Sequence, residues 1–170
     1  MPIIYNMLKQ LDRISPAKTV HAHCDIPCGI YDPHGAQIAA HTIIRMNALI
    51  TEFAHDHEKH DPKHAQEHAH KLARCTFVKE QHAEICEREL QTLWVDYFKP
   101  EHIEKYDLHD LFWKTMKLTG KTRQEISPQA AQELLENVMK IAEIFWETKG
   151  VKCHRIPAPY PSGGEIVMPR

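Results

Sequence analysis

Residues 127–150 read SPQAAQELLENVMKIAEIFWETKG, and this stretch has the clearest helical pattern in the chain. Its apolar residues recur at spacings of three and four, the period that places side chains on one face of a helix. Ser127 and Pro128 are typical of a helix start, and Gly150 is typical of a helix end. The apolar positions are Leu134, Val138, Ile141 and Phe145. The stretch therefore predicts a helix with one face that other helices must cover.

Three further segments show the same period upstream. The first follows Asp32 and Pro33, the second runs from Asp61 and Pro62 to Pro100, and the third covers 103–120. In the first segment the apolar face is predicted to be Ile38, Thr42, Met46, Leu49, Ile50 and Phe53. No segment alternates strongly enough to predict a strand. The sequence predicts an all-α protein, an antiparallel four-helix bundle over 34–150, followed by an irregular Pro/Gly-rich tail over 151–170 that lies outside it.

Composition narrows the function classes. A length of 170 residues suits one domain, and a net charge of −2 with 26% charged residues gives no basic face for nucleic acid. No apolar run approaches the roughly 18 residues that span a membrane. Five cysteines are an odd number and too few for a secreted disulfide framework, and they favour a reducing compartment such as the cytoplasm.

The first 22 residues allow two interpretations. Val20-His21-Ala22 resembles a cleavage site, yet charged residues interrupt the apolar stretch that a secretion signal needs. The segment is either a removable leader, cut between Ala22 and His23, or a short helix that packs on the bundle.

Histidines crowd the connection between the first two predicted helices. They are His55, His57, His60, His64, His68 and His70. Three of them lie four residues apart and could chelate a metal from one helical face. They are mixed with charged residues, so the favoured interpretation is a hydrated loop and helix start with weak metal affinity. Cys75 and Cys86 are expected to be small buried apolar residues.

Residues 23–28 read HCDIPC and hold the most reactive side chains of the chain. Two cysteines at this spacing alone fit a disulfide or half of a zinc site. If the chain is cut after Ala22, however, the amine of His23, the amide nitrogen and thiolate of Cys24 and the thiolate of Cys28 give four in-plane donors. A square plane of N and S donors suits Ni(II) or Cu(II) better than zinc. The His23 imidazole then reaches the axial position, which favours a higher oxidation state.

The stretch HCDIPCGIYDP at 23–33 resembles the nickel-binding hook of the nickel superoxide dismutase family. KEQHAE at 79–84, LWVDYFKPEHIEKY at 93–106 and IFWETK at 144–149 are also similar to that family. The resemblance implies a four-helix subunit with one nickel ion, a homohexamer, and removal of residues 1–22 by a leader-processing protease. It also implies one-electron Ni(II)/Ni(III) cycling that converts superoxide to oxygen and hydrogen peroxide.

The same resemblance implies roles for individual residues. His23, Cys24 and Cys28 are the expected metal ligands, and Asp25 and Tyr31 shape the approach of the substrate. Further from the metal, Tyr97 and Lys99 match residues near the site entrance, where Lys99 would draw in an anion. Packing alone also explains Tyr31, and ordinary solvation explains Lys99.

Two positions depart from the family pattern. A Glu and an Arg that brace the axial imidazole in some members correspond here to Ala39 and His82, so the surroundings of the metal must differ. Two other functions stay open on the residues alone. One is a nickel- or copper-binding storage or delivery protein without redox turnover, and the other is a helical interaction module whose Cys24 and Cys28 form a disulfide.

Overall fold

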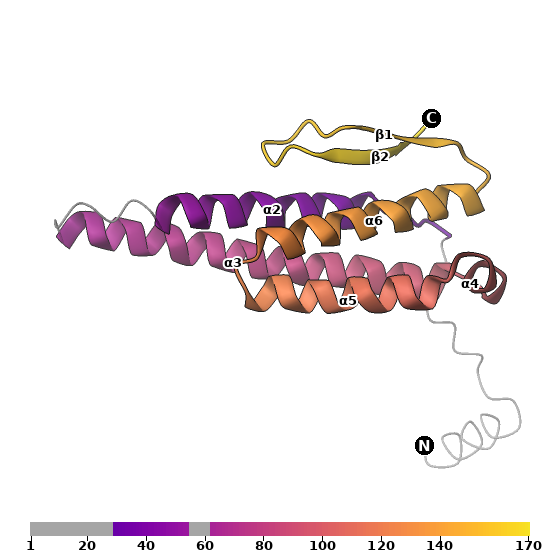
Figure 1. Ribbon diagram of the computed structural model, residues 1–170, viewed down its shortest axis with the longest axis horizontal. Helices are drawn as coiled ribbons and strands as arrows, with labels where there is room; N and C mark the ends of the chain where they lie inside the picture. The colour runs from indigo at the N-terminus through magenta and orange to yellow at the C-terminus, as the bar shows by residue number, and fades with distance from the viewer. Residues whose placement is uncertain (1–28, 55–61) are drawn as a thin grey trace, which may run out of the picture.

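The computed structural model describes residues 29–54 and 62–170 and shows a helical bundle with a small sheet on top (Figure 1). Helices α2, α3, α5 and α6 lie side by side, and each packs against two of the others. None of the helices in the described ranges is long and apolar enough to cross a membrane. The elements in chain order are α2 (His34–Ala54), α3 (Pro62–Thr92), η1 (Leu93–Tyr97), α4 (Pro100–Tyr106), α5 (Leu108–Gln124), α6 (Pro128–Thr148), β1 (Cys153–Pro157) and β2 (Glu165–Pro169).

Helix α6 follows its predicted pattern closely. The hydroxyl of Ser127 accepts a hydrogen bond from the backbone N–H of Ala130 (3.3 Å), and Pro128 occupies the first turn. The four apolar residues of the predicted face are all fully buried in the core: Leu134, Val138, Ile141 and Phe145. The prediction of a helical bundle is thereby confirmed.

Helix α2 is buried on a different face from the one predicted. Its buried apolar residues are mainly small: Ala36, Ala39, Ala40, Ile43 and Ile50. Of the predicted stripe only Ile50 is buried, and Ile38 is 41% exposed. The sequence prediction chose the face with the largest apolar side chains. Small residues let a neighbouring helix approach closely, so the buried face of α2 is the one that carries the alanines.

The connection between α3 and α5 is also more broken than predicted. Helix α3 passes into a single π-helical turn, η1, and the backbone N–H of Phe98 closes that turn on the carbonyl of Leu93 (3.0 Å). The predicted third helix is two helices, α4 and α5. They meet at Asp107, whose φ of 50° is left-handed and interrupts the helical path.

The predictions of an irregular tail and of an absence of strands were wrong. Strands β1 and β2 pair antiparallel, with Arg155 opposite Val167 and Ile156 opposite Ile166. The side chains of Ile166 and Val167 are each 1% exposed, and Val167 joins the core of the bundle. The prolines and glycines that indicated disorder instead lie at the turn and strand ends, where they interfere least with pairing.

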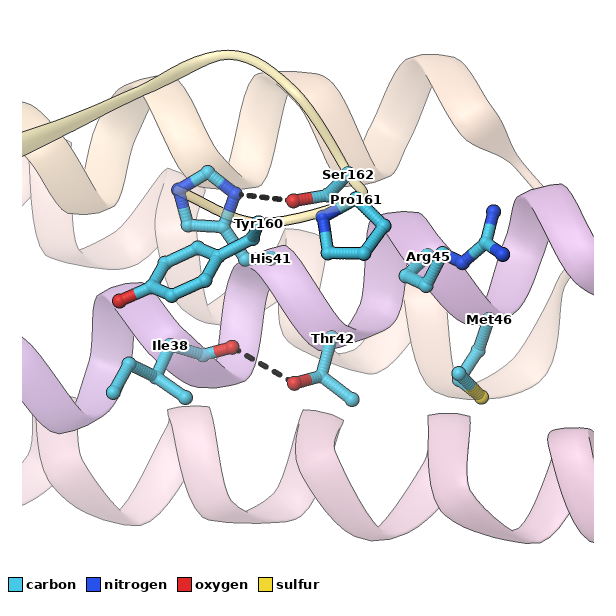
Figure 2. Close-up of a pocket in the computed structure, with 8 residues that line it drawn as sticks. All are labelled: Ile38, His41, Thr42, Arg45, Met46, Tyr160, Pro161 and Ser162. Atoms are coloured by element: carbon cyan, nitrogen blue, oxygen red, sulfur yellow. Dashed lines mark hydrogen bonds between the residues drawn. The ribbon is translucent and has the colours of Figure 1, made fainter. Parts of the chain in front are cut away.

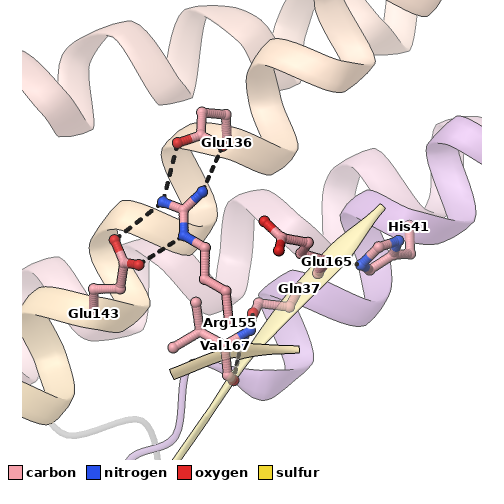
Figure 3. A network of polar contacts seen from close by, with 7 residues as sticks. All are labelled: Gln37, His41, Glu136, Glu143, Arg155, Glu165 and Val167. Atoms are coloured by element: carbon pink, nitrogen blue, oxygen red, sulfur yellow. Dashed lines mark hydrogen bonds and ion pairs between the residues drawn. The ribbon is translucent and has the colours of Figure 1, made fainter. Parts of the chain in front are cut away.

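The hairpin lies over α2 and α6 and is held to α2 by two polar side chains. Nδ1 of His41 pairs with the hydroxyl of Ser162 (2.9 Å), and the ring of Tyr160 lies edge-on to the imidazole (Figure 2). Nε2 of His41 pairs with the carbonyl of Glu165 (3.1 Å). The Gln37 amide donates to the carbonyl of Val167 (3.1 Å) and accepts from its N–H (2.7 Å) (Figure 3). Gln37 therefore pairs with the edge of β2 as a neighbouring strand would.

On the other side the hairpin is held to α6 by a charged cluster. The guanidinium of Arg155 binds both oxygens of Glu136 (2.9 and 3.0 Å) and both oxygens of Glu143 (2.7 and 3.1 Å) (Figure 3). The hydrogen bonds that Arg155 donates to Glu143 and Glu136 raise its pKa above the ordinary value. Bidentate pairing holds the guanidinium in one orientation as well as stabilising the contact. Because the hairpin also contacts α2, it connects α2 to α6.

A buried lysine joins α3 to the end of α5. Lys79 is only 2% exposed, and its ammonium donates to the carbonyls of Thr122 (2.8 Å), Arg123 (3.1 Å) and Glu125 (2.8 Å). These carbonyls include C-terminal groups of α5 that have no partner within the helix, and the positive charge also matches the helix dipole. Burial lowers the pKa of Lys79, with Glu80 acting in the opposite direction.

Candidate metal centre

The predicted metal ligands lie outside the described residues. His23, Cys24 and Cys28 are among residues 1–28, as are Asp25 and the predicted cleavage site between Ala22 and His23. Within the ranges 29–54 and 62–170, no group of three or more His, Cys, Asp or Glu side chains is placed to hold a metal ion. The described part of the chain therefore contributes the surroundings of the predicted hook.

Those surroundings begin directly after Cys28. Gly29 has a φ of 69°, a left-handed conformation that a residue with a Cβ rarely adopts. Two residues later the ring of Tyr31 packs against the ring of Tyr97, with centroids 5.6 Å apart. Tyr31 and Tyr97 are both partly buried against the core. After residue 28 the chain thus continues through a left-handed glycine and is anchored on the bundle by an aromatic pair.

Tyr97 itself is oriented by α6. Its hydroxyl lies 2.6 Å from the hydroxyl of Thr148, which donates to the carbonyl of Phe145 (2.7 Å). Since the Thr148 proton is used for that carbonyl, the Tyr97 O–H must donate to Thr148. Tyr97 therefore presents lone pairs, rather than a proton, on its free side.

One cation contacts this aromatic pair, and a second follows Tyr97 by two residues in the sequence. The ammonium of Lys149 is 5.3 Å from the centre of the Tyr97 ring, a cation–π distance. Lys99 is exposed and caps α4, where its backbone N–H donates to Nδ1 of His102 (3.2 Å). That bond assigns the proton of the neutral His102 ring to Nε2. Lys149 is a residue that the sequence interpretation missed, although IFWETK contains it.

The two positions that depart from the family pattern lie on neighbouring helices. Cys86 donates to the carbonyl of Ala36 (3.6 Å), and His68 lies against the carbonyl of Phe53 at the other end of α2, so α2 and α3 run antiparallel. Ala39 and His82 then lie at about the same level, one turn along each helix. Ala39 is buried, and His82 uses Nδ1 to bind the carbonyl of Val78 within α3 (2.9 Å). His82 therefore keeps its Nε2 side for other contacts.

The described cysteines are Cys75, Cys86 and Cys153, and none of them belongs to a group of side chains that could hold a metal ion. Burial, with Glu89 and Glu87 nearby, raises the pKa of Cys86 to about 12, so this thiol stays protonated at neutral pH. Burial and two glutamates also raise the pKa of Cys153. Cys86 is a buried apolar residue, as predicted, whereas Cys75 is only partly buried.

One described histidine near the first loop contacts the backbone of α2. Nε2 of His68 lies 2.6 Å from the carbonyl of Phe53, near the end of α2. His55, His57 and His60 lie outside the described residues.

The donor set of the predicted hook suits nickel. Two soft thiolates, an amine and a deprotonated amide nitrogen are strongly donating ligands, and a square plane of such donors would favour Ni(II) over Zn(II) or Mg(II). A positive-φ glycine follows Cys28, and the Tyr31–Tyr97 pair lies just beyond it. The residues present therefore fit a nickel ion held by the segment before Gly29.

Comparison with known proteins agrees with this chemistry. A family described as nickel-containing superoxide dismutase matches residues 18–149. The chain is 40% identical over 144 residues to the superoxide dismutase [Ni] of Streptomyces coelicolor, and this match covers 84% of the chain and 98% of that protein. The corresponding protein of Streptomyces seoulensis is 38% identical with the same coverage.

Solved structures are similar as well. The native structure of nickel superoxide dismutase superimposes with a TM-score of 0.63 at 37% identity, covering 75% of this chain and 99% of that one. The fold and the hook therefore define a nickel-dependent oxidoreductase. The chain belongs to the nickel-containing superoxide dismutase family. The family match ends at residue 149, so the hairpin lies beyond it.

Proposed function

We propose that this chain, freed of residues 1–22, converts superoxide to oxygen and hydrogen peroxide. Two superoxide anions and two protons give one molecule of each product, so the site must attract an anion, exchange single electrons and deliver protons. The observation that carries the proposal is the HCDIPC hook joined through Gly29 and Tyr31 to Tyr97 in a chain of this family.

The ligands in this proposal are the amine and imidazole of His23, the amide nitrogen and thiolate of Cys24, and the thiolate of Cys28. Nickel bound by them would supply the one-electron exchange between Ni(II) and Ni(III). Cleavage after Ala22 is needed because it turns the His23 nitrogen from an amide into an amine that can bind a metal.

The surrounding residues have separate tasks. Tyr97 accepts rather than donates on its free side, because its proton is committed to Thr148, so it acts as a positioning residue for Tyr31. Tyr31, two residues after Gly29, is proposed to orient the substrate together with Asp25, and its ring contact with Tyr97 supports a defined position for its side chain. Lys99 is exposed and contributes positive charge at the entrance, which raises the local concentration of an anion. His82 takes the place of an arginine and is proposed to tune the axial side.

The assembly and processing are part of the same proposal. The subunit is expected to form a homohexamer with one nickel ion in each copy, after a protease has removed the leader. We place the mature protein in the bacterial cytoplasm, because its sparse cysteines suit a reducing compartment.

The test compares two forms of the protein. The chain beginning at His23 and the full 170-residue chain are both exposed to Ni(II), and intact mass, nickel content and superoxide consumption are measured. The leader-free form should hold about one nickel per chain and be active, whereas the full chain should do neither. Full activity of the uncut chain would overturn the proposal. Nickel retention without turnover in the leader-free chain would instead support the storage or delivery alternative.

Cysteine variants test the ligand assignment. Cys24→Ser or Cys28→Ser in the leader-free chain should remove nickel and activity but leave helical content unchanged, because both lie before the first bundle helix. Normal nickel-dependent activity in either variant would place the metal elsewhere.

A further inference from the structure

The turn of the hairpin places a serine hydroxyl against a buried imidazole. Oγ of Ser162 lies 2.9 Å from Nδ1 of His41 (Figure 2), and Nε2 of the same ring lies 3.1 Å from the carbonyl of Glu165. A carbonyl can only accept a hydrogen bond, so Nε2 carries the proton of the neutral ring and Nδ1 carries a lone pair. The O–H of Ser162 therefore donates to Nδ1. A serine that donates to an imidazole, whose other nitrogen is held by an acceptor, has the arrangement of an activated nucleophile.

The imidazole is held in the form that can accept a proton. His41 is 2% exposed, and burial lowers its pKa, while the hydrogen bond to the carbonyl of Glu165 acts in the opposite direction. The ring of Tyr160 lies edge-on to it, with centroids 5.1 Å apart. At neutral pH the base next to Ser162 is therefore unprotonated and has one orientation.

A small apolar pocket opens beside this pair. Its volume is about 210 Å³, and both Ser162 and His41 line it (Figure 2). The apolar part of the lining comes from Ile38, Met46 and Pro161. Pockets for drug-sized ligands measure about 300–1,000 Å³, so this one suits only a short apolar group.

The two glycines after Ser162 supply the backbone of the same turn. Gly163 and Gly164 have left-handed φ angles of 65° and 77°. The N–H of Gly163 donates to the carbonyl of Tyr160 (3.0 Å), whereas the N–H of Gly164 has no acceptor within the described residues. A Cβ built on Gly164 would lie 3.8 Å from Cε1 of His41, so this glycine lies beside the imidazole. Its N–H is a donor available to a developing oxyanion.

We propose that Ser162 is a nucleophile that hydrolyses small esters with a short apolar acyl group, and that His41 is its general base. Oγ of Ser162 bonds to the acyl carbon, the bond to the leaving alcohol breaks, and the serine proton passes through Nδ1 of His41 to the alcohol oxygen. Water then attacks the acylated serine, and its proton returns through His41 to Oγ. The balance is ester plus water giving acid plus alcohol.

This activity is separate from the proposed superoxide reaction. Ser162 and Glu165 lie beyond residues 18–149, the range that matches the family. Neither ester step exchanges an electron or needs a metal. Ser162→Ala should therefore lose ester hydrolysis but keep nickel content and superoxide consumption, so the two activities can fail independently.

The experiment labels the folded protein with an alkyl fluorophosphonate, which reacts with activated serines. The full chain and the leader-free, nickel-loaded chain should each gain one phosphonyl group, located on Ser162 by peptide mass mapping, and should hydrolyse p-nitrophenyl butyrate. Ser127 is the internal control and should stay unlabelled, because its hydroxyl accepts from the N–H of Ala130. An unlabelled Ser162, or equal labelling of Ser127, would mean that Ser162 only holds the hairpin and would overturn the proposal.

Two variants separate reactivity from structure. Ser162→Ala should abolish labelling and lower ester hydrolysis by about 100-fold. His41→Gln can still contact Ser162 and Glu165 through its amide but cannot take up a proton, so hydrolysis should fall by a similar factor while hydrogen exchange of the β2 amides stays unchanged. Labelling of Ser162 at the wild-type rate in His41→Gln would overturn the role of the base. If exchange rises in that variant, Ser162→Ala decides alone, and hydrolysis that survives it would refute the nucleophile.

Discussion

Helices α6 and α2 have the same length but differ in how far their sequences predict their surroundings. In α6 the large apolar residues are the buried ones, and Leu134, Val138, Ile141 and Phe145 all lie in the core. In α2 the large residues Met46 and Leu49 line a surface groove, while the alanines are buried. The difference shows that a periodic pattern identifies a helix reliably but identifies its core-facing side only when the neighbours are also known.

The hairpin has the largest effect on which residues of α2 are buried. Gln37 and His41 are polar, yet they are 0% and 2% exposed, because β2 and the hairpin turn cover them and satisfy their hydrogen bonds. Helix α2 consequently has three sides with different surroundings. Its alanines face the bundle, Gln37 and His41 face the hairpin, and Met46 and Leu49 line the surface groove.

The largest expected effect comes from removing the hairpin. A chain ending at Gly150 loses the burial of Ile166 and Val167 and leaves Gln37 and His41 without partners. Burial of such side chains contributes about 1.5–3 kcal/mol each, so unfolding free energy should fall by about 5 kcal/mol. Urea denaturation followed by circular dichroism measures this. A truncated chain as stable as the full one would mean that the hairpin is only loosely attached.

The contrast between the two helices can be measured with one pair of substitutions. Leu134→Ala in α6 should cost about 3 kcal/mol because it leaves a cavity in the core, where the residue is fully buried. Met46→Ala in α2 should cost less than about 1 kcal/mol in the isolated subunit, because the residue borders an open groove. The same denaturation assay compares them, at a protein concentration where both are monomeric. An equal loss of unfolding free energy in the two variants would contradict the placement of Met46 at the surface.

The Lys79 ammonium offers a polar counterpart to these apolar changes. Lys79→Met keeps the volume but leaves three carbonyls near the end of α5 without their donor. The expected loss is about 2–3 kcal/mol of unfolding free energy. Lys140→Met, at an exposed position of α6, is the matched control and should change stability little. An unchanged midpoint for Lys79→Met would show that water replaces the ammonium at no cost.

Much of this architecture could be predicted from local sequence signals. Ser127 and Pro128 mark a helix start through their own chemistry, and the six residues HCDIPC carry a donor set that needs no bundle to be recognised. These features depend only on residues a few positions apart in the chain, so the sequence alone is enough to recognise them.

The hairpin could not be predicted because its partners are distant. Val167 pairs with Gln37, 130 residues away, and nothing near Val167 signals that pairing. Arg155 likewise depends on Glu136 and Glu143 in the preceding helix. The Pro and Gly content of 151–170 is equally typical of a tight hairpin and of an irregular tail, and only the available partner surface decides between them.

Gln37 allows a finer test of how the hairpin is held. Gln37→Glu keeps the acceptor for the N–H of Val167 but places an oxygen against its carbonyl, so it should cost about 1–3 kcal/mol at neutral pH. Gln37→Met removes both bonds without adding a charge and should cost less. Hydrogen exchange of the β2 amides measures the local effect, which should be confined to the hairpin. Faster exchange throughout α6 would show that the change is not local.

The smallest expected effect is a pH dependence at His41. Burial lowers the pKa of this imidazole, and the hydrogen bond to the Glu165 carbonyl only partly offsets that. Because the folded pKa lies below the unfolded value of about 6.5, the unfolded chain takes up the proton first. The stability contributed by neutral His41 is therefore complete above about pH 6.5 and is lost as the pH falls toward the folded pKa, by at most about 1.4 kcal/mol per pH unit. Other histidines titrate in the same range, so the quantity to measure is the difference in unfolding free energy between the wild type and His41→Gln at pH 7.5 and pH 5.5. That difference should shrink on acidification; a difference that stays constant would mean that His41 is protonated equally in both states and that the hairpin does not exclude water from it.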